Sequence, residues 1–116
     1  MAYDINDFEH DVITRSFELP VLADFWAAWC GPCRTLGPVL EKLADAANGA
    51  WTLAKVDTER FPEVSGRFGI RGIPAVKLFI AGEVAGEFTG ALPEGQVRQF
   101  LERHLPNETR ARIAAA

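Results

Sequence analysis

The sequence predicts an α/β sandwich, in which a mixed β-sheet lies between helices on its two sides. Two apolar runs typical of buried strands, residues 21–26 and 51–57, are separated by a stretch with the apolar spacing of a helix. Two β-rich runs, 75–80 and 84–88, are joined by a short turn containing glycine and predict an antiparallel hairpin. A chain of 116 residues has room for one domain.

Composition excludes several classes of protein. Apolar residues make up 48% of the chain and charged residues 24%, which indicates a folded protein. The formal net charge of -4 has the wrong sign for binding phosphate backbones, so we expect no nucleic-acid partner. No apolar run approaches the roughly 20 residues that span a bilayer, and the acidic N-terminus does not resemble a signal peptide. We therefore expect a cytoplasmic protein without a membrane partner.

Four helices are predicted around the strands. The first begins at Asn6, a capping residue followed three positions later by Glu9, and its apolar spacing continues to about Ser16. The others are predicted from the cysteines to Asn48, over 59–68 and over 92–105. Pro106 ends the last of them, so we expect a domain over 1–106 and a tail over 107–116. The tail contains good helix formers and little to pack, which is compatible with a frayed end or the start of a further helix.

Cys30 and Cys33 are the only cysteines, and their spacing indicates redox chemistry. A disulfide that closes so short a loop removes little entropy from the unfolded chain, so a purely structural bridge explains it poorly. Zinc needs about four ligands in a recognisable pattern, which this sequence lacks, so no metal site is expected. Cys30 begins a helix, whose free N–H groups stabilise a thiolate, and is the predicted nucleophile. Cys33 follows by nearly one turn on the same face and is predicted to resolve the mixed disulfide.

Asp24 is a charged residue inside the apolar run 21–26. Burial disfavours the ionised carboxyl and raises its pKa, which suits a group that accepts a proton from Cys33 and later returns it. A buried acid is also often structural, with its oxygens bonded to the backbone. The residue by itself leaves both interpretations open.

Three separated segments resemble the thioredoxin family. They are Asp-Phe-Trp-Ala-Ala-Trp-Cys-Gly-Pro-Cys over 24–33, Gly-Ile-Pro over 72–74 and Phe-Thr-Gly-Ala over 88–91. The resemblance runs from about Phe8 to Leu105 and implies a thioredoxin fold, with a central mixed five-stranded sheet and about four helices in three layers. The first strand would be residues 2–5, which is shorter than is usual in the family.

The resemblance also implies roles for individual residues. Asp24 would transfer the proton of Cys33, and the ammonium group of Lys55 would approach the Asp24 carboxyl and couple to its titration. A surface lysine whose stem covers apolar neighbours is the alternative for Lys55. The Ile73–Pro74 bond would be cis and face the Cys30–Cys33 redox disulfide.

A flat apolar docking surface beside the cysteines is a further implication, and the backbone there would pair with an extended substrate segment. Its expected members are Trp29, Gly31, Pro32, Gly72, Ile73, Pro74, Gly90 and Ala91. Gly90 could equally be a turn glycine. Pro32 is also expected to favour the dithiol, which makes the protein a reductant.

The expected activity is that of a monomeric protein thiol–disulfide oxidoreductase, acting in electron transport and cell redox homeostasis on disulfide-containing proteins. By the same resemblance the chain binds no cofactor and is reduced by NADPH through a flavin-dependent thioredoxin reductase. The alternative is a redox-capable thioredoxin module of a longer co-chaperone that binds client proteins, because helical repeats in such proteins begin where residues 107–116 lie.

Overall fold

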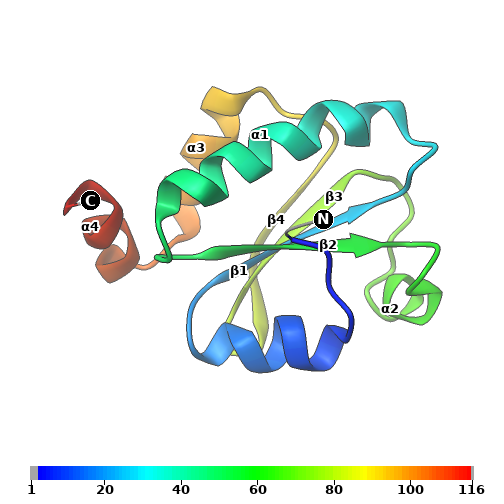
Figure 1. The fold of residues 1–116 in the computed structure, drawn as a ribbon, viewed down its shortest axis with the longest axis horizontal. Helices are drawn as coiled ribbons and strands as arrows, with labels where there is room; N and C mark the ends of the chain where they lie inside the picture. The colour runs from blue at the N-terminus through cyan, green and yellow to red at the C-terminus, as the bar shows by residue number, and fades with distance from the viewer. Residues whose placement is uncertain (1–2, 116) are drawn as a thin grey trace.

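The computed structural model describes residues 3–115 and confirms the α/β architecture (Figure 1). The strands of its sheet are β1 (Val21–Trp26), β2 (Thr52–Asp57), β3 (Ala75–Ile80) and β4 (Glu83–Thr89). Their order across the sheet is β2-β1-β3-β4, with β1 parallel to β2 and β3 antiparallel to both β1 and β4. The central strands β1 and β3 have almost no polar residues because helices cover both of their faces.

Helices form the two outer layers. The helices are η1 (Glu9–Thr14), η2 (Arg15–Phe17), α1 (Gly31–Ala47), α2 (Pro62–Arg67), α3 (Glu94–His104) and α4 (Asn107–Ala115). Helices α1 and α3 lie on one face of the sheet, and η1, η2 and α2 lie on the other (Figure 1). The predicted three-layer sandwich is therefore confirmed.

Successive side chains of β1 point to opposite faces of the sheet and belong to two separate hydrophobic cores, one on each face. Leu22 packs under α1 and α3, whereas Val21, Ala23 and Phe25 pack against η1 and α2. Because side chains alternate along a strand, Asp24 lies on the same face as Leu22, beneath α1. The alternation therefore places a carboxyl group under the helix that begins at the cysteines.

The prediction of a fifth strand is wrong for the described residues, which form a four-stranded sheet. Residue 2 lies outside them, and the strand pairing of residues 3–5 is an isolated parallel bridge between Asp4 and Lys55 on β2. Two backbone hydrogen bonds hold this bridge: the Lys55 N–H donates to Tyr3 O at 2.8 Å, and the Ile5 N–H donates to Lys55 O at 3.4 Å. The chain then turns into the first helix, so there are too few extended residues for a ladder.

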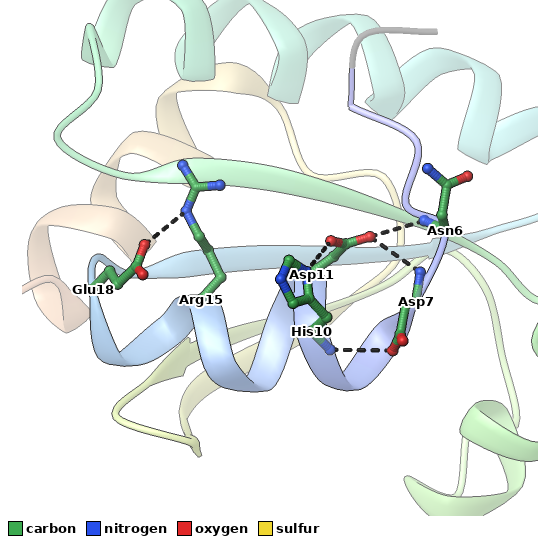
Figure 2. Close-up of polar contacts among 6 residues, drawn as sticks. All are labelled: Asn6, Asp7, His10, Asp11, Arg15 and Glu18. Atoms are coloured by element: carbon green, nitrogen blue, oxygen red, sulfur yellow. Dashed lines mark hydrogen bonds and ion pairs between the residues drawn. The ribbon is translucent and has the colours of Figure 1, made fainter.

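The N-terminus of that helix is capped differently from the prediction (Figure 2). Instead of an Asn6–Glu9 pair, the Asp7 carboxylate accepts from the His10 N–H at 3.2 Å. The Asp11 carboxylate reaches back and accepts from the N–H groups of Asn6 and Asp7 at 2.9 and 3.1 Å. Hydrogen bonds from the His10 ring and these two amides lower the pKa of Asp11 from 3.8 to about 2. The cap ends the extended N-terminal segment.

Helix α4 follows α3 after Pro106, and Ile113 on α4 packs against the core beneath α1 and α3. Figure 1 shows α4 at the end of the molecule where α1 finishes. None of the helices within residues 3–115 is long and apolar enough to cross a membrane.

Candidate active site

Cys30 and Cys33 form a disulfide at the junction between β1 and α1. Cys30 is the N-cap of α1, with an extended backbone, and its Sγ accepts a hydrogen bond from the Cys33 N–H at 3.2 Å. Pro32 occupies the first turn, where a missing N–H costs the helix nothing. Both cysteines are buried, with 5% and 4% of their surface exposed. The cysteine pair thus lies after the end of β1, at the N-terminal, positive end of the dipole of α1.

This arrangement favours negative charge on one sulfur. The first N–H groups of α1 have no partners inside the helix, and the helix dipole adds partial positive charge there. The Sγ of Cys30 already accepts one of these N–H groups in the disulfide form. In the dithiol form the same donor can stabilise a Cys30 thiolate.

The loop before β3 brings a second segment to the cysteines. The Ile73–Pro74 peptide bond is cis, and the Ile73 carbonyl oxygen lies 3.7 Å from Cys30 Sγ. Gly90, at the end of β4, donates its N–H to Pro74 O at 2.8 Å and has a φ of 93°. This positive φ favours glycine, so Gly90 has a turn role as well as a place beside Pro74.

An exposed aromatic side chain stands beside the disulfide. Trp29 is 66% exposed, and its indole N–H points to Glu59 Oε2 at 3.3 Å. The other expected members of the docking surface include the exposed residues Gly31, Pro32, Gly72 and Ala91, while Ile73 and Gly90 are partly buried and Pro74 is buried. Five of the eight expected members are therefore exposed to solvent.

Asp24 is 1% exposed, and neither of its carboxylate oxygens has a hydrogen-bond partner among the described residues. The backbone bonds that a purely structural acid would need are therefore not made. Burial raises the pKa of Asp24 from 3.8 to about 7, opposed by the charge of Lys55 and reinforced by that of Glu41. A carboxyl with this pKa gains or loses a proton near neutral pH.

Lys55 lies opposite Asp24 in the parallel register of β1 and β2. Its side chain is 13% exposed, and its Nζ is 3.0 Å from Glu41 Oε2 on α1 and 4.8 Å from the centre of the Trp26 ring. Lys55 is therefore not a freely solvated surface lysine. Its ion-pair partner is Glu41 rather than Asp24.

Glu41 was missed by the sequence analysis, although a signal for it exists. It follows Gly37 by four residues and Cys33 by eight, so the three share one face of α1. Because Cys33 and Gly37 are buried, this face points at the sheet and places Glu41 over the neighbouring strand β2. Helical spacing from the second cysteine would have indicated it.

Within residues 3–115, no group of three His, Cys, Asp or Glu side chains is placed to hold a metal ion.

The family model for thioredoxin matches residues 2–103, which is most of the chain. The chain belongs to the thioredoxin family. It is 42% identical to "Thioredoxin" of Chlorobaculum thiosulfatiphilum over 85 residues, 73% of this chain and 79% of that protein. It is 42% identical to "Thioredoxin 1" of Nostoc sp. over 98 residues, 84% of this chain and 90% of the relative. "Thioredoxin" of Haemophilus influenzae is 36% identical over 101 residues, 87% of this chain and 94% of the relative.

Family membership and the disulfide at the start of α1 together give the activity. The thioredoxin-family chain is a thiol–disulfide oxidoreductase, a protein-disulfide reductase whose redox-active pair is Cys30 and Cys33. Its substrates are proteins that contain disulfides. Proteins of the thioredoxin family bind no cofactor themselves.

Proposed function

We propose that Cys30 is the nucleophile and Cys33 the resolving cysteine of this reductase. The observation that carries the assignment is the position of Cys30 as N-cap of α1, with its Sγ accepting the Cys33 N–H. The Cys30 thiolate attacks one sulfur of a substrate disulfide, forms a mixed disulfide and releases one substrate thiolate. The Cys33 thiolate then attacks Cys30 Sγ and releases the second substrate thiolate. Two electrons pass to the substrate, and the chain leaves as the Cys30–Cys33 disulfide.

Asp24 supplies the base for the second step. Cys33 must lose its proton before it attacks, and a buried carboxylate beneath α1 can take that proton and later return it. The support is the burial of Asp24, its lack of hydrogen-bond partners and its raised pKa. Lys55 couples to this titration through its charge.

Substrate disulfides dock on the surface formed by Trp29, Gly31, Pro32, Gly72, Ile73, Pro74, Gly90 and Ala91. Its support is the exposed Trp29 ring beside the disulfide and the contact of Ile73 O with Cys30 Sγ. An extended substrate segment would add hydrogen bonds to the backbone of Ile73.

The reduced state is regenerated by NADPH through a flavin-dependent thioredoxin reductase, so the chain carries electrons between that enzyme and its substrates. A reductant of this kind suits the cytoplasm, where thiols are kept reduced, and a role in cell redox homeostasis. We assign the catalytic domain to 1–106, with 107–116 as a tail, and the working form to a monomer.

The test is NADPH consumption with a thioredoxin reductase and insulin as the disulfide substrate. Native protein should turn over, while Cys30→Ser and Cys33→Ser should lose steady-state turnover. Cys33→Ser should in addition accumulate a mixed disulfide that mass spectrometry detects, which Cys30→Ser should not. Accumulation in Cys30→Ser instead would contradict the assignment of the nucleophile.

A client-binding role is the second candidate, favoured by helix α4 and by the groove beside it. This groove has a volume of about 520 Å³ and is lined by residues of α1, α3 and α4, among them Leu43, Leu101 and Ile113. A holdase assay with both cysteines replaced by serine tests it. Suppression of client aggregation by that variant supports the role, and loss of suppression contradicts it.

A further inference from the structure

The ammonium group of Lys55 has two acidic side chains within its electrostatic reach but pairs with only one. Its Nζ is 3.0 Å from Glu41 Oε2. Asp24, its neighbour across the β1–β2 register, has neither oxygen bonded to a protein group among the described residues. An ammonium group and an ionised carboxylate in a low-dielectric site attract each other strongly. The position of the Lys55 ammonium group therefore depends on its other contacts, above all on Glu41.

The contacts of Lys55 place its Nζ on the Glu41 side, against α1. The nearest atom to a Cβ added at Gly37 of α1 would be this Nζ, at the ordinary contact distance of 3.5 Å. The Trp26 ring lies on another side of the ammonium group, with 4.8 Å from Nζ to the ring centre. The ion pair is also largely shielded, with 13% of the Lys55 side chain and 33% of the Glu41 side chain exposed.

Few charged groups face Asp24. Lys55 approaches from β2 and Glu41 from α1, and both change its pKa through their charges. On β3 the register partner of Asp24 is Val76, which is uncharged. Asp57, the next acid on β2, lies opposite Trp26 and accepts the Glu59 N–H at 2.9 Å. Cys30 and Cys33 are joined in the disulfide and do not titrate in this form.

We propose that Glu41 is a positioning residue for this reaction: by pairing with Lys55 it keeps the ammonium group off Asp24, and so keeps that buried carboxyl available to take the proton of Cys33. The proposal rests on the proposed role of Asp24 as the base that deprotonates Cys33. Without Glu41, Lys55 would turn toward Asp24 and favour its ionised form. An Asp24 carboxyl with a lower pKa would be a weaker base toward Cys33 and would accept its proton less readily.

The direct test follows the Asp24 carboxyl by carbon NMR in the oxidised full chain, so that cysteine titration does not contribute. In Glu41→Gln the midpoint should fall by about one pH unit, because an opposite charge within about 4–6 Å lowers a carboxyl pKa by about that much or more. Glu41→Asp, which retains the charge, should stay near the native midpoint. The matched control is Glu94→Gln, which breaks the Lys42–Glu94 ion pair, also 3.0 Å long, on the exposed side of α1.

A double-mutant cycle separates positioning from direct repulsion between the two carboxylates. Lys55→Met alone should raise the Asp24 midpoint. If Glu41 acts through Lys55, adding Glu41→Gln to Lys55→Met should change the midpoint much less than in the native background. An unchanged midpoint in Glu41→Gln would overturn the proposal, and so would a full shift that persists without Lys55.

The pH profile of insulin reduction tells this proposal apart from the proposed function. When Glu41→Gln lowers the titration midpoint of Asp24, the pH at which the rate of insulin reduction changes should fall with it. A moved midpoint with an unmoved profile would leave the placement of Lys55 by Glu41 standing, and would contradict the role of Asp24 in deprotonating Cys33.

Discussion

Replacing Asp24 by Asn should remove most of the dependence of stability on pH between about pH 5 and pH 8. Burial raises the pKa of this carboxyl from 3.8 to about 7, so the folded protein binds the proton more tightly than the unfolded chain. The protonated form therefore stabilises the fold at low pH. That stabilisation decreases as the pH rises from about 4 and is gone above about 7. Asn has nearly the same shape and does not titrate.

The magnitude follows from the difference between the two pKa values. A difference of about 3, between 3.8 and about 7, corresponds to about 4 kcal/mol over the whole range, at about 1.4 kcal/mol for each pKa unit. Between about pH 5 and pH 8 the folded protein should lose about 2.5 kcal/mol from this group. Asp24 is 1% exposed, so solvent does little to screen the effect.

The assay is guanidinium unfolding of the oxidised protein at both pH values, for the native chain and for Asp24→Asn. The quantity to compare is the change in unfolding free energy between the two pH values, because other titrating groups contribute equally to both proteins. Glu63→Gln, which alters an exposed carboxylate on α2, is the control and should behave like the native chain. Equal pH dependence in the native chain and Asp24→Asn would refute the reasoning.

Two further substitutions test the packing and the N-terminal cap. Gly86→Ala should destabilise the fold by about 1–3 kcal/mol in a thermal melt, because its Cβ would lie 2.7 Å from Cγ of the His104 ring. Gly95→Ala, where a Cβ meets nothing within 4 Å inside α3, should stabilise slightly, and equal effects at the two sites would contradict this explanation. Asp11→Ala should cost about 0.5–2 kcal/mol at neutral pH, because two backbone N–H groups lose their acceptor. Hydrogen exchange should become faster at those two amides, and unchanged exchange would exclude the cap.

The elements that could be predicted are those with a strong local pattern. The run 21–26 is almost entirely apolar, and it forms the central strand β1. Apolar spacing after Cys33 predicted a helix to Asn48, and α1 ends at Ala47 with Asn48 in a left-handed conformation as its C-cap. Each of these patterns reflects burial of one element against the sheet or the helices, so it is present in the chain itself.

The errors occurred where the local pattern was weak. Residues 2–5 were expected to form an edge strand, but within the described part of this segment, residues 3–5, the structure has one isolated bridge. The chain then passes into the first helix, whose Asp11 carboxylate accepts from the N–H groups of Asn6 and Asp7. Asn6 and Glu9 have the spacing of a capping box, yet Asp7 and Asp11 make the bonds, and Glu9 pairs with Arg67 on α2. Several carboxylates lie close to the same backbone N–H groups at this end of η1. Which carboxylate accepts each hydrogen bond depends on how η1 packs.

The sequence by itself determined the order of strands and helices, the place of Cys30 and Cys33 at the start of a helix, and the presence of an acid in a buried strand. These follow from neighbours in the chain, whose spacing sets which face each side chain occupies. Only the tertiary structure decided that Lys55 pairs with Glu41 and leaves Asp24 without a hydrogen bond. That choice depends on strand register and on the approach of α1 to β2, which bring together residues far apart in the sequence.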